Sequence, residues 1–85
     1  MYYVYVLQSQ KDKKLYIGQT VDLRNRFKEH QNGLSRSTKY RRPWKLIYYE
    51  SYLDQHVAIM REGQLKKFNT AYYELRKRLK RSIQI

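Results

Sequence analysis

Two tyrosines, Tyr5 and Tyr16, fall in two stretches that are typical of neighbouring β-strands, residues 2–8 and 14–18. With the connecting turn centred between residues 10 and 11, we expect the two tyrosines to lie directly opposite one another. Directly opposed residues hold their Cβ atoms roughly 4.5–5.5 Å apart, so two phenols would meet on one face of the hairpin. The two hydroxyl groups would then stand side by side on the face away from the main core. The alternative is an aromatic pair that only stabilises a small sheet.

The same register sorts the other residues of the hairpin. It places Gly18 opposite Tyr3 at a strand end, where the missing side chain would let a ligand or a backbone come close, although a turn explains a glycine there equally well. A slip by one residue would break both the tyrosine pair and the apolar pairing, so we expect the register to be well specified. The apolar face, suited to packing under helices, consists of Val4, Val6, Leu15 and Ile17.

A cation and a titratable ring follow on the next predicted helix. Asp22 is a plausible N-cap, and the Asn32-Gly33 pair is typical of a helix end. Arg26 and His30 are four residues apart and therefore share one face. The arginine could hold a phosphate through two hydrogen bonds, and the histidine could relay a proton or contact a phosphate. The alternatives are a snorkelling arginine and a histidine that caps the helix end.

Glu62 is the acid of greatest interest. It lies beside the apolar stripe of a helix that we expect to begin after Asp54 and to reach about Phe68. A carboxylate there could hold a hard divalent cation whose other positions are filled by water and phosphate oxygens. The default alternative is a salt bridge to Arg61, Lys66 or another cation.

The remaining elements must position these groups. Leu23 and Phe27 mark an amphipathic helix after the hairpin, and residues 44–52 are aromatic and β-branched enough for a third strand. Asn69 or Thr70 could cap a last helix that reaches the basic tail. The order β-β-α-β-α-α predicts an α+β fold, in which a three-stranded, mostly antiparallel sheet is flanked by helices.

The composition limits the classes of protein to consider. Eighty-five residues allow one domain, residues 1–85, with a basic tail from about residue 76. The absence of cysteine excludes a disulfide framework, a thiolate zinc site and a cysteine nucleophile. No apolar stretch approaches the roughly 18 residues of a membrane span. The N-terminus lacks the basic region of a signal peptide, so we expect a cytoplasmic protein.

The formal charge of +12 points to a polyanionic partner. Its excess lies in residues 36–45 and 76–81, and nucleic acid is the commonest partner of such a surface. Tyr40 or Trp44 could stack on an unpaired base. The alternative is a solvated face with a basic tail.

The pattern of tyrosine motifs, arginine and glutamate resembles the GIY-YIG nuclease superfamily over nearly the whole chain. The matching residues are Tyr3-Val4-Tyr5, then after ten residues Tyr16-Ile17-Gly18, then Arg26, and Glu62 in an Arg-Glu-x-x-Leu-Lys context. The sequence is most similar to the small single-domain bacterial branch (the YhbQ type), related to the N-terminal nuclease domain of UvrC. The resemblance implies an endonuclease that hydrolyses DNA with one Mg²⁺ or Mn²⁺ ion, with a role in DNA repair or recombination.

The resemblance assigns roles to individual residues. The catalytic set is Tyr5, Tyr16, Arg26, His30 and Glu62, with Glu62 also binding the metal. Together with the charge, it gives a nucleic-acid-binding set of Gly18, Arg36, Lys39, Tyr40, Arg41, Arg42 and Asn69. Tyr40 takes the place of a loop histidine that some members have. Asn69 matches a late asparagine of the family or is only a helix cap. The first motif departs from the family name, because Tyr3 and Val4 replace its glycine and isoleucine.

The implied reaction asks for a tyrosine that deprotonates water, and either Tyr5 or Tyr16 could be that base. We expect the surrounding positive charge to lower the pKa of these phenols from about 10. Arg26 would brace the phosphate oxygens as charge builds on them. Selectivity should follow shape, such as nicks, flaps or branches, rather than base sequence. The alternative function is a non-catalytic module that binds DNA or RNA, for which the charge alone suffices.

Overall fold

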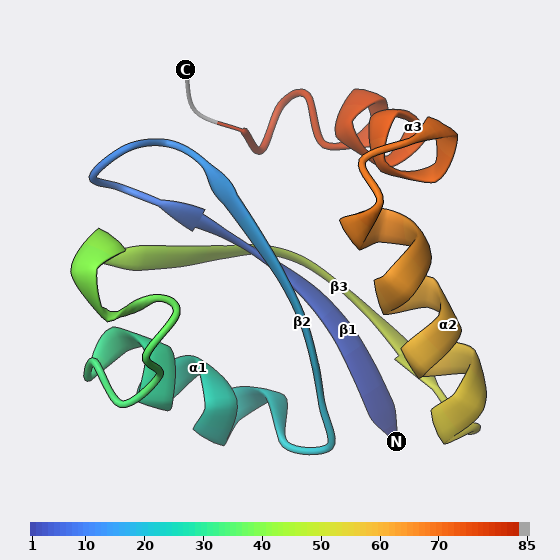
Figure 1. Ribbon diagram of the computed structural model, residues 1–85, viewed down its shortest axis with the longest axis horizontal. Coiled ribbons are helices and arrows are strands. Elements are labelled where there is room, and N and C mark those ends of the chain that lie inside the picture. Colours follow the sequence, from blue (N-terminus) through green and yellow to red (C-terminus); the bar gives the residue numbers. More distant parts are fainter. Residues whose placement is uncertain (84–85) are drawn as a thin grey trace.

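The computed structural model describes residues 1–83. It is an α+β domain with the element order that the sequence predicts, and its three strands form one antiparallel sheet in the order β2-β1-β3 (Figure 1). None of the helices in this part of the chain is long and apolar enough to cross a membrane. The elements are β1 (Tyr2–Ser9), β2 (Leu15–Thr20), α1 (Leu23–Gln31), the short 3₁₀ helix η1 (Lys39–Arg41), β3 (Trp44–Tyr52), α2 (Gln55–Lys66) and α3 (Thr70–Arg78).

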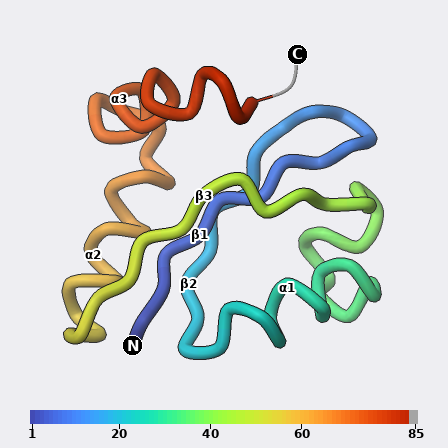
Figure 2. The backbone as a smooth tube through the Cα atoms, turned by 180° about the vertical axis from the view of Figure 1, so that it is seen from behind, coloured from blue at the N-terminus to red at the C-terminus, as the bar shows by residue number. Residues whose placement is uncertain are grey.

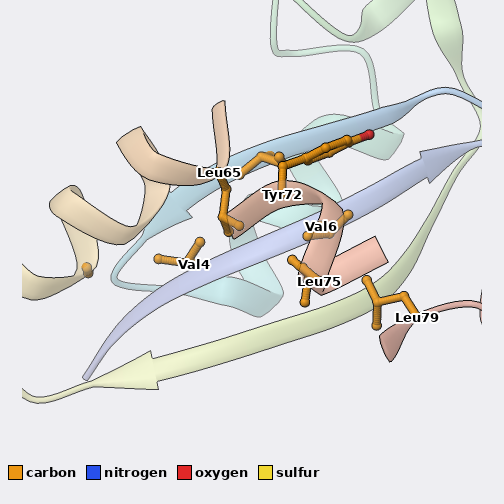
Figure 3. Packing of buried hydrophobic residues seen from close by; sticks show 8 residues of the cluster. Val4, Val6, Leu65, Tyr72, Leu75 and Leu79 are labelled. Atoms are coloured by element: carbon orange, nitrogen blue, oxygen red, sulfur yellow. The ribbon is translucent and has the colours of Figure 1, made fainter. Parts of the chain in front are cut away.

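The sheet carries helices on both faces, and in Figures 1 and 2 the strands pass between α1 on one side and α2 with α3 on the other. The alternation of side chains along β1 divides its residues between two cores. The α2–α3 side holds the larger one, part of which Figure 3 shows: Val4, Val6, Ile17, Ala58, Leu65, Tyr72, Leu75 and Leu79. The α1 side holds Tyr5, Leu7 and Trp44, with Tyr16, Leu23, Phe27 and Leu46 packed against them. The tyrosine face of the hairpin is therefore covered by α1.

Two of the predicted helix caps are confirmed. The Asp22 carboxylate accepts a hydrogen bond from the backbone N–H of Asn25 (3.1 Å), at the start of α1. The Asp54 carboxylate accepts one from the backbone N–H of His56 (2.8 Å), at the start of α2. Asn69 occupies the N-cap position of α3, but its side chain makes no capping hydrogen bond. Each satisfied cap contributes about 1 kcal/mol to helix stability.

The predicted register of the hairpin is wrong by two positions. Tyr5 pairs with Gly18 rather than Tyr16, so every β1 partner lies two residues further along β2. The turn itself explains the shift. The Ser9 hydroxyl accepts from the N–H groups of Lys11 and Asp12 (both 3.1 Å), and Lys13 adopts a left-handed conformation with φ 63°.

These bonds move the centre of the turn towards Asp12, whose carboxylate also accepts from the Lys14 N–H at 2.9 Å. Because strand side chains alternate with a period of two, a shift of two residues leaves each side chain on its predicted face. The apolar face under α2 and α3 is therefore confirmed. What changes is the residue opposite Tyr5, and this change decides the geometry of the site.

Candidate active site

The Tyr5 side chain lies across the backbone of Gly18. A Cβ atom added at Gly18 would lie 2.3 Å from the Tyr5 hydroxyl oxygen and 2.4 Å from its Cζ, so the phenol ring lies directly against the Gly18 backbone. Both residues are buried. Gly18 does permit a close approach, as predicted, but Tyr5 rather than nucleic acid takes the space.

His30 holds the Tyr5 hydroxyl in place. Its side chain is buried, with 0% of the residue exposed. Nε2 lies 2.8 Å from the Tyr5 hydroxyl, and Nδ1 lies 2.7 Å from the Thr38 hydroxyl. Since both ring nitrogens are bonded to side chains, His30 is not a helix cap. Burial, with the nearby Arg26 charge, lowers the pKa of His30 to about 4, so the ring is neutral at pH 7.

Thr38 is the site residue that sequence reasoning missed. It is fully buried between α1 and β3, and its carbonyl accepts a hydrogen bond from the indole N–H of Trp44 (3.0 Å). Its hydroxyl also lies 3.4 Å from the carbonyl oxygen of Ser35. A threonine in a basic loop carries no signal of this role in the sequence. The role follows from the way the loop folds back over the end of α1.

The pKa of Tyr5 departs from the expectation. Burial raises it to about 12, and the charges of Tyr16 and Glu62 act in the same direction, whereas Arg26 lowers it. Positive charge does act on this phenol in the predicted direction, through Arg26, but the net shift is upward. Desolvation of a phenolate outweighs the attraction of one arginine here. Tyr5 is a neutral phenol at pH 7.

Arg26 and Glu62 approach Tyr5 from different helices. The Arg26 guanidinium bonds to the Glu29 carboxylate (3.1 Å) and the Ser35 hydroxyl (3.4 Å), and its hydrogen bond to Tyr5 lowers the pKa of the phenol. Glu62 comes from α2, on the other face of the sheet, yet its charge acts on the same phenol. The charge of Glu62 can act on Tyr5 from the other face because β2, which Tyr5 faces at Gly18, is an edge strand without a side chain at that point.

Glu62 also forms the expected salt bridge, with the Lys66 ammonium at 3.2 Å. Its side chain remains 22% exposed. Arg61 does not pair with Glu62, because its guanidinium binds the Glu50 carboxylate of β3 at 2.9 Å. The Glu62 carboxylate is therefore partly exposed, and a metal ion would compete with Lys66 for its oxygens.

Tyr16 lies next to Tyr5, although the two are diagonal rather than opposite. Their ring centroids are 6.4 Å apart, and the Tyr16 ring is 5.2 Å from that of His30 in an edge-on arrangement. Tyr16 is only half-buried. The structure thus brings together four of the predicted catalytic side chains, Tyr5, Tyr16, Arg26 and His30, with the charge of Glu62 acting on Tyr5.

The donor groups restrict the kind of metal that would fit. In residues 1–83 there is no group of three or more His, Cys, Asp or Glu side chains that could hold an ion. A single carboxylate suits only a cation such as Mg²⁺, which keeps several waters and takes further oxygens from a substrate phosphate. Glu62 fits that requirement once the Lys66 ammonium has moved away from its carboxylate.

The predicted nucleic-acid residues lie mostly on and around η1. Tyr40 is exposed, with the Lys39 ammonium 4.8 Å from its ring centroid. Arg41 pairs with Asp12 of the hairpin turn (2.9 Å) and lies over the Trp44 ring (4.9 Å). Trp44 is only 2% exposed, so the prediction that it could stack on a base is wrong.

Three predicted contact residues remain. Arg36 is exposed in the loop before η1. Arg42 is exposed after η1, and its Nε donates to the Lys39 carbonyl at 2.7 Å. Asn69 is exposed at the junction of α2 and α3.

The fold is a small α+β domain in which tyrosine, histidine and arginine side chains lie together on the α1 side of a three-stranded sheet. The model of the GIY-YIG catalytic domain matches residues 1–80, and the chain belongs to this family of nuclease domains.

Its relatives include proteins called UPF0213. The one from Pediococcus pentosaceus is 45% identical over 67 residues, which cover 78% of this chain and 70% of that protein. The one from Syntrophus aciditrophicus is 41% identical over 71 residues, covering 81% and 80%. The solution NMR structure of the UPF0213 protein BH0048 from Bacillus halodurans superposes with a TM-score of 0.58 at 29% identity, covering 94% of this chain and 86% of that one. The predicted family and its small bacterial branch are thereby confirmed.

Proposed function

We propose that this domain is a metal-dependent endonuclease that hydrolyses phosphodiester bonds in DNA. The observation that carries the proposal is the Tyr5 hydroxyl, held 2.8 Å from His30 and subject to the opposing charges of Arg26 and Glu62. Membership of the GIY-YIG family supports it. A phenol that feels both a cation and a carboxylate, beside an edge strand, is a place where a water and a phosphate can be brought together.

Arg26 would bind the non-bridging oxygens of the scissile phosphate. Its side chain is one-third exposed, and a phosphate would replace its contacts with Glu29 (3.1 Å) and Ser35 (3.4 Å). A guanidinium aimed at a phosphate stabilises the charge that builds in the transition state. Glu62 would hold one Mg²⁺ or Mn²⁺ ion, which when bound supplies Lewis-acid stabilisation of the phosphate and of the leaving oxygen.

Tyr5 and Tyr16 would orient and deprotonate the attacking water. The Thr38 hydroxyl donates a hydrogen bond to the Ser35 carbonyl and accepts one from Nδ1 of His30. In that arrangement, Nε2 of His30 accepts a hydrogen bond from the Tyr5 hydroxyl. One lone pair of the Tyr5 oxygen accepts from Arg26, which leaves the other to accept a hydrogen bond from water. With its pKa near 12, Tyr5 orients that water as a neutral phenol before any proton moves. Separate Tyr5→Phe and Tyr16→Phe variants would identify the base.

The positive surface would supply affinity. Neutralising phosphates with the exposed cations around η1 and α3 gives binding that depends on salt but little on base sequence. We therefore propose selectivity for DNA structure, such as nicks, flaps or branches, and a role in DNA repair or recombination in the cytoplasm.

A second function, a non-catalytic nucleic-acid-binding module, is favoured by two observations. The pKa of Tyr5 is raised rather than lowered, and the Glu62 carboxylate is already paired with Lys66. Binding of DNA or RNA would need the charged surface but neither of these groups.

The decisive experiment incubates the protein with nicked, branched and single-stranded DNA and with RNA, in the presence of Mg²⁺ or Mn²⁺. We expect wild type to cleave, and Tyr5→Phe, Arg26→Ala and Glu62→Ala each to lose at least about a hundredfold, the scale of one lost transition-state contact. Glu74→Ala is the matched control, because Glu74 on α3 also pairs with a lysine of its own helix. A wild type that cleaves nothing, or Glu62→Ala equal to wild type, would overturn the proposal. Unchanged binding without cleavage would leave the binding module as the function.

A further inference from the structure

A hollow lies beside α1, on the side away from Arg26. It has a volume of about 660 Å³ and is walled by Tyr3 and Tyr49 of the sheet and by Leu23 and Phe27 of α1. Arg24 and Lys28 also line it. Residues two apart on a helix point about 200° apart, so Arg24 and Arg26 lie on opposite flanks of α1. The hollow therefore lies on the flank of α1 away from Arg26, although its Tyr49 pairs with Tyr5 in the sheet.

The walls of the hollow are aromatic and partly open to solvent. The rings of Tyr3 and Tyr49 meet edge-on, with centroids 6.0 Å apart and planes at 68°. Tyr49 is 54% exposed, although it lies within the third strand. An irregularity between Tyr48 and Leu46 in the pairing of β1 with β3 brings Leu46 to the same side of the sheet as Tyr49. An exposed ring over an apolar floor is a surface on which a flat group can stack.

Two cations border this aromatic surface. Arg24 and Lys28 are exposed and four residues apart, so their side chains stand on one face of α1. Within residues 1–83 neither of them forms an ion pair with a carboxylate. The acid in the hollow, Asp22, is engaged as the N-cap of α1. The hollow thus combines a stacking surface with two uncompensated positive charges.

We propose that this hollow binds an unpaired nucleotide of single-stranded DNA, with the base on Tyr49 and the adjoining phosphates on Arg24 and Lys28. An apolar peptide or an acyl chain would use the walls and leave both cations unsatisfied, whereas a nucleotide uses both. The inference rests on the proposed function for its choice of nucleic acid as ligand, but not on cleavage. It makes a single-stranded segment part of the preferred substrate.

The test measures binding of fluorescein-labelled dT10 by anisotropy in EDTA, where no cleavage can occur. We expect Tyr49→Ala to weaken binding at least about fivefold, the effect of losing one stacked base, and Tyr49→Phe to bind like wild type. The matched control is Tyr73→Ala, because Tyr73 on α3 is 57% exposed and also lies among cations, Arg76 and Lys77. Equal affinities for Tyr49→Ala and wild type, or a larger loss in Tyr73→Ala, would overturn the proposal.

The charge arm uses Arg24→Ala with Lys28→Ala, two exposed helix positions whose change leaves the core intact. We expect the log–log salt slope for dT10 to become less steep by about 1.4, since each neutralised phosphate of a single strand contributes about 0.7. An unchanged slope would contradict the proposal. The cations would then have no phosphate partner.

Amide NMR of the wild-type protein locates the site without relying on any variant. Addition of unlabelled dT10 in EDTA should shift the amides of residues 21–28 and of Tyr49. Shifts confined to η1 or α3 would overturn the proposal. Cleavage by wild type with Tyr49→Ala binding dT10 normally would sink this inference and leave the nuclease standing. If binding depends on Tyr49 but the protein never cleaves, the nuclease proposal fails and this inference stands.

Discussion

The phenol ring of Tyr5 lies against the backbone of Gly18, the residue that faces it directly in the pairing of β1 with β2. Tyr5 belongs to the central strand, yet its hydroxyl is influenced by groups from both helix layers. That is possible because the edge strand carries no side chain at the crossing point. A single glycine therefore connects the hairpin register to the chemistry of the site.

Gly18→Ala should damage both the fold and the site. Its Cβ would lie 2.3 Å from the Tyr5 hydroxyl oxygen, and the buried ring cannot move without losing its bond to His30. We expect the free energy of unfolding, measured with urea, to fall by about 1–3 kcal/mol, and cleavage to fall with it. Gly63→Ala is the control, since a Cβ there meets nothing within 4 Å and alanine favours the helix. Equal stabilities of Gly18→Ala and wild type would contradict the close contact.

Stability should depend on pH through His30. Its pKa is about 4 in the folded protein and about 6.5 in an unfolded chain, so between these values the unfolded state binds more protons. The contribution of the neutral ring is complete above pH 6.5 and is lost as the pH falls towards 4, amounting to about 3 kcal/mol.

Urea unfolding at several pH values from 4.5 to 7.5 would measure how the free energy of unfolding changes with pH, and this slope reflects the pKa shift of His30. His30→Gln should flatten it. His56→Gln should not, because His56 is the other histidine of the chain and is exposed. A steep slope that survives in His30→Gln would assign the titration to other groups.

Glu50→Gln should loosen the attachment of α2 to the sheet. The Glu50 carboxylate accepts hydrogen bonds from the Tyr48 hydroxyl (2.6 Å), the Tyr52 hydroxyl (2.5 Å) and the Arg61 guanidinium (2.9 Å). Burial alone would raise the pKa of Glu50, but these bonds hold it below its usual value. We expect a loss of about 1–3 kcal/mol in urea unfolding, because Arg61 is left half-buried without its partner. Since Arg61 neighbours Glu62, cleavage should weaken too, and an unaltered unfolding midpoint would argue against the network.

Lys66→Ala should strengthen the binding of a divalent cation. The Lys66 ammonium lies 3.2 Å from the Glu62 carboxylate and competes for the same oxygens. An exposed pair of this kind is worth under about 1 kcal/mol, so we expect Mn²⁺ affinity, measured by calorimetry, to rise by up to about fivefold. Lys77→Ala, which frees Glu74 in the same way on α3, should have no effect. Equal gains in both variants would mean that the ion does not bind at Glu62.

Much of the fold could be predicted because it depends on neighbours in the chain. The strands, the caps at Asp22 and Asp54 and the order of elements follow from alternation, capping chemistry and helix periodicity. The register could not, because it depends on which of several possible hydrogen bonds the Ser9 hydroxyl forms in the turn.

The chemistry-bearing residues were identifiable from the sequence by type and spacing, but their states were not. The sequence alone determined that Tyr5, Arg26, His30 and Glu62 are present on elements that could meet. Only the tertiary structure decided that Tyr5 is a neutral phenol and that His30 is held by Thr38, a residue eight positions away in a loop. Hydrogen-bond partners and pKa values depend on burial and on distances between groups far apart in the chain, and these quantities exist only once the sheet and helices have packed.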